Sequence, residues 1–148
     1  MKFLIINGPN INMLGIRAPA IYGSLTYKAL VASCLKWCKD VGVDAECFQS
    51  NHEGAIVDRI QQAYFDQVDG IVMNPAAYTH TSVAILDALK ATAIPTVEVH
   101  ISDVHTREAF RHHSYVSLAA LKTIIGHGVN GYKEGIEWLA NELRKQAD

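Results

Sequence analysis

The sequence lacks a strong excess of charge of either sign. Its 148 residues contain 13 Lys and Arg against 15 Asp and Glu, which gives a formal net charge of −2 at pH 7. Proteins that bind nucleic acid or anionic membranes usually carry a basic patch, so we expect neither partner. No apolar run approaches the roughly 20 residues of a membrane-spanning helix. The apolar run after Lys2 is too short for the core of a signal peptide. We therefore expect a cytoplasmic protein.

Metal and nucleotide signatures are also missing. A metal site would require further Cys or His at ligand spacing. Cys34, Cys38 and Cys47 have no such neighbours in the sequence. Free cysteine behaves as a small hydrophobic residue, so we expect these thiols to be buried in a reducing compartment. The GxGxxG motif of dinucleotide-binding domains is absent. The sequence predicts neither a metal nor a cofactor.

Apolar runs alternate with amphipathic stretches along the whole chain. This pattern is typical of βαβ units, in which helices cover both faces of a parallel sheet. Five such units predict a single α/β domain over residues 1–148, a flavodoxin-like doubly wound sheet with strand order 2-1-3-4-5. The predicted strands are 2–7, 43–49, 70–73, 96–101 and 122–125, and the predicted helices are 26–41, 53–65, 79–92, 106–112 and 131–146.

Polar side chains gather where the predicted strands end. Segment 7–10 (NGPN) follows the first strand, segment 74–80 (NPAAYTH) the third, and segment 100–111 the fourth. Ligands of such sheets bind beyond the carboxyl ends of the strands, near the switch in strand order. The polar cluster therefore predicts a binding or catalytic site at this edge.

Two ionisable residues interrupt the fourth predicted strand. Glu98 and His100 share one face because strand side chains alternate, whereas the central strand of a parallel sheet is normally apolar on both faces. Two residues along one face span roughly 7 Å between Cα atoms, within reach of a side-chain contact. A buried carboxylate would orient the imidazole and favour its protonated form, as a general acid requires. A purely structural ion pair is the alternative.

A long connection over residues 8–24 links the first strand to the first helix. Connections of this length without regular structure are usually functional or disordered, and a lid over the site is one interpretation. Its chemical candidates are Arg17 and Tyr22. Ionising an ordinary tyrosine at pH 7 costs about 4 kcal/mol, much of which a neighbouring arginine could supply. Considered alone, both residues are more typical of an exposed loop.

Three segments carry a family resemblance. NGPNINMLGIRAPAIYG (7–23), NPAAYTHTSVAILDA (74–88) and EVHISDVHTREAFRHHSY (98–115) resemble the three signatures of type II dehydroquinases, in the same order and spacing. The resemblance covers essentially the whole chain. It implies a 3-dehydroquinate dehydratase, which eliminates water from 3-dehydroquinate through an enolate to give 3-dehydroshikimate.

The resemblance also implies catalytic roles. Tyr22 matches the base that removes the proton at C2, and Arg17 matches the residue that lowers the pKa of this tyrosine. Asn10 matches the position that holds a water against the enolate. His100, oriented by Glu98, matches the acid that protonates the departing C1 hydroxyl.

Substrate contacts are implied in the same way. Asn74 and the backbone amides of Ile101 and Ser102 match the positions that bind the substrate carboxylate. His80 and Arg111 match the contacts to the ring hydroxyls.

One matched position implies assembly. Asp87 matches a residue that the family supplies from a neighbouring subunit, in dodecamers built as tetramers of trimers. If His80 and Asp87 lie on one helix, seven residues place them roughly 10 Å apart along its axis. A second subunit would remove the difficulty of bringing both to one small substrate.

The sequence departs from the family pattern at three positions. Ala18 replaces an acidic residue and Asp103 replaces an asparagine. Ala76 stands where the family usually has glycine, which leaves open whether this position has a positive φ. We expect effects on affinity or on the lid, with the reaction retained.

Members of other protein classes remain as alternatives. A flavodoxin-like cofactor-binding protein would need a phosphate-binding loop rich in Ser, Thr and Gly after the first strand. A phosphoacceptor signalling domain would need an acidic pair after the first strand and an Asp at the end of the third. The chain has neither feature.

Overall fold

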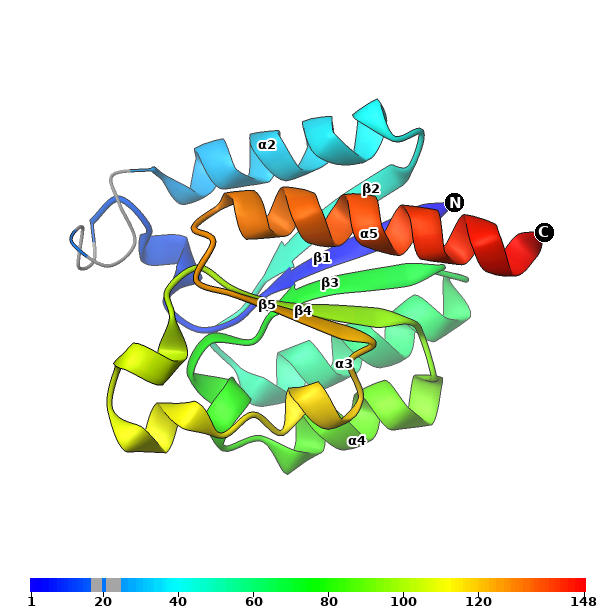
Figure 1. The fold of residues 1–148 in the computed structure, drawn as a ribbon. Coiled ribbons are helices and arrows are strands. Elements are labelled where there is room, and N and C mark those ends of the chain that lie inside the picture. The colour runs from blue at the N-terminus through cyan, green and yellow to red at the C-terminus, as the bar shows by residue number, and fades with distance from the viewer. Residues whose placement is uncertain (17–19, 21–24) are drawn as a thin grey trace.

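A five-stranded parallel sheet forms the centre of the protein (Figure 1). The computed structural model describes residues 1–16, 20 and 25–148. The strand order β2-β1-β3-β4-β5 confirms the predicted flavodoxin-like topology. The strands are β1 (Lys2–Asn7), β2 (Asp44–Gln49), β3 (Gly70–Asn74), β4 (Thr96–His100) and β5 (Lys122–Ile125).

Helices cover the two faces of the sheet in pairs. α2 (Tyr27–Asp40) and α5 (Asn130–Ala147) lie on one face, and α3 (Glu53–Phe65) and α4 (Val83–Thr92) on the other (Figure 1). Thr26 caps α2, because its hydroxyl accepts a hydrogen bond from the backbone N–H of Ala29 at 3.1 Å. Gly42, at φ +74°, follows this helix in the left-handed conformation that favours glycine. Within the described part of the chain, no helix is both long and apolar enough to cross a membrane.

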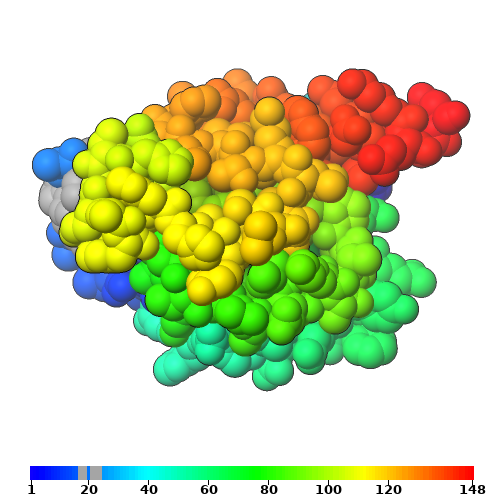
Figure 2. Space-filling model, turned by 60° about the horizontal axis from the view of Figure 1, so that its bottom comes forward, coloured from blue at the N-terminus to red at the C-terminus, as the bar shows by residue number. Residues whose placement is uncertain are grey.

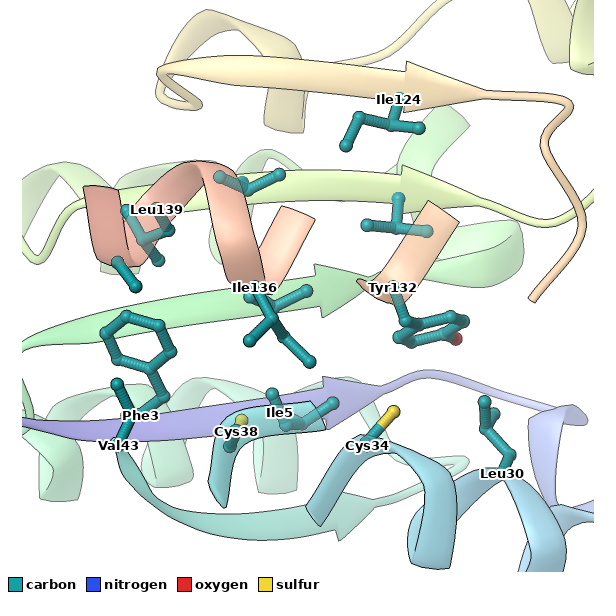
Figure 3. Packing of buried hydrophobic residues seen from close by; sticks show 14 of the residues in the cluster. Phe3, Ile5, Leu30, Cys34, Cys38, Val43, Ile124, Tyr132, Ile136 and Leu139 are labelled. Carbon is teal, nitrogen blue, oxygen red and sulfur yellow. The ribbon is translucent and has the colours of Figure 1, made fainter. Parts of the chain in front are cut away.

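The apolar side chains of the sheet form one core on each face. Alternation along β1 sends Phe3 and Ile5 toward α2 and α5, while Leu4 and Ile6 face α3 and α4. All four side chains are fully buried or nearly so. Figure 3 shows the first core, in which Tyr132 of α5 reaches the carboxyl end of the sheet.

The three cysteines are packing residues. Cys34 and Cys38 are fully buried in α2 and Cys47 is partly buried in β2, as expected. Burial raises the pKa of the Cys38 thiol to about 12 and that of Cys47 to about 11. These thiols therefore stay protonated and unreactive at neutral pH.

The predicted helix over 79–92 is wrong at its start. Ser82 is the N-cap of α4, where its hydroxyl accepts a hydrogen bond from the backbone N–H of Ile85 at 2.9 Å. The preceding residues form a separate 3-10 helix, η2 (Ala76–His80). His80 and Asp87 therefore do not share a helix, and the axial separation expected between them does not apply.

The single helix predicted over 106–112 is also wrong. The segment after β4 forms three 3-10 turns: η3 (Val104–Thr106), η4 (Ala109–His112) and η5 (Val116–Leu118). Extended backbone at Arg107 and Glu108 separates the first two turns and prevents a continuous helix. Figure 2 shows the yellow surface of this segment between the green surface of α4 and the orange surface of the C-terminal part.

Candidate active site

A cleft opens at the carboxyl ends of β1, β3 and β4. This is the edge at which η1 (Ile11–Met13), η2 and η3 follow the strands, on the left of Figure 1. Its position agrees with the rule for ligand sites in doubly wound sheets. The predicted site residues that line it are Asn10, Asn74, His80, His100, Ile101, Ser102 and Arg111.

Glu98 and His100 form a buried pair at the end of β4. Val97 and Val99 pack into the core beneath α5, so the two ionisable side chains point to the opposite face, as strand alternation predicted. Glu98 is fully buried, and His100 retains 5% of its exposure. His100 Nε2 contacts Glu98 Oε2. This leaves Nδ1 as the imidazole nitrogen that can exchange a proton with a ligand in the cleft.

Two hydroxyl side chains also approach the Glu98 carboxylate. Ser114 Oγ lies 2.9 Å from Glu98 Oε2 and 3.1 Å from Oε1, and Thr123 Oγ1 lies 3.5 Å from Oε1. Buried carboxylates need such donors. Neither residue was predicted from the sequence. The register of the sheet, which pairs Glu98 with Thr123, is the only signal that could have identified Thr123.

Three polar side chains form a buried network beneath the floor of the cleft. Asn74 Nδ2 donates a hydrogen bond to Tyr132 Oη at 3.0 Å, and Tyr132 Oη donates to Asn7 Oδ1 at 2.6 Å. Asn74 Oδ1 accepts from the backbone N–H of Ala76 at 3.0 Å. Burial raises the pKa of Tyr132 well above its ordinary value, so its hydroxyl stays protonated. Both ends of the Asn74 amide are thereby fixed. Tyr132 was not predicted to contribute.

The loops after β1 and β3 are in direct contact. Gly8 N–H donates to the backbone oxygen of Asn74 at 2.8 Å. A Cβ at Gly8 would lie 2.4 Å from the backbone oxygen of Pro75, so only glycine fits there. The contact fixes the relative position of Asn10 and Asn74 in the cleft.

Two residues near the cleft have positive φ angles. Asn10 has φ +68°, and its backbone N–H donates to Asn51 Oδ1 at 3.0 Å. Ala76 has φ +53°, so the left-handed conformation is present although this position carries no glycine. Ala76 thus lies in a loop of the candidate site and has a backbone conformation that residues other than glycine seldom adopt.

His80 and Arg111 form one wall of the cleft. His80 Nδ1 lies 2.7 Å from the backbone oxygen of His113, which can only accept, so Nδ1 carries the proton. Partial burial lowers the pKa of His80, and the positive charges of His100 and Arg111 act in the same direction. Neutral His80 therefore presents Nε2 as a hydrogen-bond acceptor. Arg111 Nε pairs with Glu108 Oε2 at 2.6 Å.

The described lining of the cleft does not include every predicted site residue. Arg17 and Tyr22 lie outside the described residues, as does Ala18. Asp87 is exposed on α4 and is not part of the cleft lining. Arg107, by contrast, lines the cleft and adds a second guanidinium beside Arg111. Among residues 1–16, 20 and 25–148, no group of three or more His, Cys, Asp or Glu side chains could hold a metal ion.

Known proteins resemble this chain over nearly its full length. Residues 1–140 match the model of the dehydroquinase class II family. A catabolic 3-dehydroquinase of Aspergillus clavatus is 56% identical over 146 residues, which cover 99% of this chain and 97% of that protein. A 3-dehydroquinate dehydratase of Lachnospira eligens is 54% identical over 147 residues, which cover 99% of this chain and all of that protein. The crystal structure of type II dehydroquinase from Butyrivibrio crossotus superposes with a TM-score of 0.92 at 52% identity, covering 94% of this chain and 97% of that one.

Proposed function

The chain belongs to the dehydroquinase class II family and acts as a 3-dehydroquinate dehydratase, a hydro-lyase, and we propose that the cleft at the carboxyl ends of β1, β3 and β4 is where 3-dehydroquinate loses water. The observation that carries the proposal is the buried Glu98–His100 pair, which opens onto this cleft. The alternative of a flavodoxin-like cofactor-binding protein has no support from the family match or from the relatives.

His100 is the proton donor of the proposed reaction. Elimination breaks the C1–O bond, and the hydroxyl leaves as water when it takes a proton from the imidazole. Glu98, fully buried behind the ring, holds Nε2 and stabilises the positive charge of the protonated imidazole. The other nitrogen, Nδ1, delivers the proton.

Tyr22 is the proposed proton acceptor, and Arg17 the residue that favours its ionised form. Both roles rest on the resemblance of segment 7–23 to the family signature. The described lining of the cleft contains no tyrosine and no carboxylate; its ionisable side chains are His80, His100, Arg107 and Arg111. In the proposed reaction Tyr22 takes the C2 proton, and the resulting enolate forms the C1–C2 double bond as the hydroxyl departs.

The substrate is an anion, and the cleft offers suitable donors. The proposed carboxylate site consists of Asn74 and the backbone amides of Ile101 and Ser102. Arg111 and neutral His80 bind ring hydroxyls, as a guanidinium donor and an imidazole acceptor respectively. Asn10, which lines the cleft and has a left-handed backbone conformation, holds a water against the enolate oxygen.

We further propose a cytoplasmic homododecamer, a tetramer of trimers. Asp87 of one subunit would complete the site of its neighbour, and its exposure on α4 away from the cleft supports this. The three free thiols support a reducing compartment. The same reaction serves aromatic biosynthesis through the shikimate pathway and the breakdown of quinate. Light scattering checks the assembly, and a fully active monomer would overturn both the dodecamer and the role of Asp87.

A direct assay tests the activity. Purified protein mixed with 3-dehydroquinate should produce the ultraviolet absorbance of the conjugated enone in 3-dehydroshikimate, at a rate proportional to the protein concentration. Activity should survive EDTA, because no metal takes part. Borohydride added with substrate should not inactivate the protein, because no Schiff base forms. A folded protein that generates no enone would refute the proposal.

A further inference from the structure

Glu98 carries a buried carboxylate at the edge of the sheet where the cleft lies. Its side chain is fully buried, whereas the imidazole that it contacts stays slightly exposed. A buried carboxylate is stable as an anion only if donors satisfy both oxygens. His100 supplies one donor, to Oε2. Other residues must donate the remaining hydrogen bonds to the Glu98 carboxylate.

Ser114 supplies the closest of these donors. Its Oγ lies between the two carboxylate oxygens, 2.9 Å from Oε2 and 3.1 Å from Oε1. Thr123 Oγ1, at 3.5 Å from Oε1, is at the limit of a hydrogen bond. The half-buried Ser114 is therefore the principal neutral donor to Glu98.

The direction of the Ser114 hydroxyl is fixed by its own turn. The backbone N–H of Ser117 donates to Ser114 Oγ at 3.1 Å. This occupies a lone pair, so the hydroxyl proton has to point elsewhere, and the carboxylate is the acceptor in reach. A continuous series of hydrogen bonds thus runs from the Ser117 amide through Ser114 and Glu98 to His100.

The segment that carries Ser114 is anchored to η2. Tyr115 N–H donates to the backbone oxygen of Thr79 at 2.9 Å, and the backbone oxygen of His113 accepts from His80. Ser114 therefore approaches Glu98 from backbone that is held on both sides. A rigidly held donor can set the orientation of the group it binds.

From this geometry we propose that Ser114 is a positioning residue for proton donation by His100, which it controls by holding the Glu98 carboxylate in place. The inference rests on the proposed dehydratase function. Ser114 does not line the cleft, and the hydrogen bonds of its hydroxyl join it to Glu98 and Ser117 and not to the imidazole. Its effect passes through Glu98 alone.

Substitution of Ser114 tests the proposal. Ser114→Ala removes the donor and should lower kcat on the order of tenfold, the loss expected for one hydrogen bond to a charged group. KM should change little, because the step affected is proton transfer and not binding. Ser114→Thr keeps a hydroxyl at the same place and should restore most of the lost turnover.

Ser117→Ala is the matched control. Its hydroxyl donates to the backbone oxygen of Ser114 at 2.8 Å, so this variant loses a hydrogen bond in the same turn without touching the Ser114 hydroxyl or its own backbone N–H. It should retain wild-type kcat. Circular dichroism and thermal unfolding of each variant show whether the fold is intact. A Ser117→Ala loss equal to that of Ser114→Ala would mean that only the turn matters, and would overturn the proposal.

A double-mutant cycle isolates the route through Glu98. In a Glu98→Ala background the Ser114 hydroxyl has no carboxylate to hold, so adding Ser114→Ala should cause almost no further loss of kcat. Additive losses would refute the positioning role, as would wild-type kcat in Ser114→Ala alone. The activity of the wild-type protein in the same assay distinguishes a failure of the proposed function from a failure of the role of Ser114. An inactive wild type refutes the proposed function and this inference with it, whereas an active wild type with indifferent Ser114 variants refutes the inference alone.

Discussion

Tyr132 Oη lies 3.0 Å from Asn74 Nδ2, so a tyrosine of the last helix orients an amide at the end of the central strand. The same hydroxyl donates to Asn7, which is paired with Asn74 in the register of β1 and β3. One hydroxyl therefore connects two adjacent strand ends. The Asn74 amide cannot flip without breaking this hydrogen bond and the one from Ala76.

We predict that Tyr132→Phe destabilises the protein. The ring and its packing remain, but Asn7 Oδ1 loses its donor and Asn74 loses an acceptor in a fully buried place. The expected loss in the free energy of unfolding is about 1–3 kcal/mol, measured by urea denaturation. Tyr64→Phe, on an exposed tyrosine of α3, is the control and should change stability very little. Equal stability of the Tyr132 variant and the wild type would contradict the network.

The acid on β4 is tested by His100→Ala. Removal of a general acid typically costs 10²- to 10⁴-fold in rate, so we expect a decrease in kcat of at least about 10²-fold. Glu98→Gln keeps the shape of the side chain and loses the charge that orients and stabilises the imidazolium, so it should also be impaired. The enone assay measures both. Near-normal turnover in His100→Ala would remove this residue from the mechanism.

The base is tested by Tyr22→Phe. A phenylalanine keeps the ring and cannot accept the C2 proton, so kcat should be almost abolished while substrate still binds. Arg17→Lys keeps a positive charge and loses the planar multi-donor guanidinium, so it should be severely impaired as well. Isothermal titration with substrate separates binding from turnover. Substantial activity in Tyr22→Phe would mean that the proton acceptor is a different residue.

The protonation of His80 should change stability and substrate binding in a definite direction. Partial burial lowers its pKa, so the folded state favours the neutral imidazole. The contribution of His80 to the stability of the fold is then fully present above about pH 6.5, which is the pKa of histidine in the unfolded chain. It is lost as the pH falls through the lower pKa that His80 has in the folded state. An NMR titration should give a His80 midpoint below 6.5, with KM rising as Nε2 is protonated. His80→Gln assigns the resonance. A midpoint at or above 6.5 would contradict the expected environment.

Local patterns predicted most of the fold. β1 over Lys2–Asn7 and α3 over Glu53–Phe65 have the predicted bounds, because an apolar run and a helical repeat are properties of neighbouring residues. The Glu98–His100 contact was predictable for the same reason, since strand alternation alone places both side chains on one face. The start of α4 was missed although Ser82 carried the signal of an N-cap.

Long-range contacts account for what the sequence could not predict in the site. Tyr132 and Asn7 are 125 residues apart, and in the sequence Tyr132 resembles any apolar position of an amphipathic helix. Ser114 and Glu98 are 16 residues apart, joined by a segment with two 3-10 turns whose path follows no simple period. Partners of this kind are determined by tertiary packing, which a local pattern does not encode.

The contact between the first strand and the last helix also has a consequence for biosynthesis of the protein. Asn7 leaves the ribosome early, but its buried partner Tyr132 is translated only after all five strands. Until α5 docks, the core over Phe3 and Ile5 lacks one of its two covering helices, and the Asn74 amide keeps only its hydrogen bond from the backbone N–H of Ala76. A nascent chain released before residue 130 would therefore carry every strand of the sheet and still lack the hydroxyl that connects the side chains of Asn7 and Asn74.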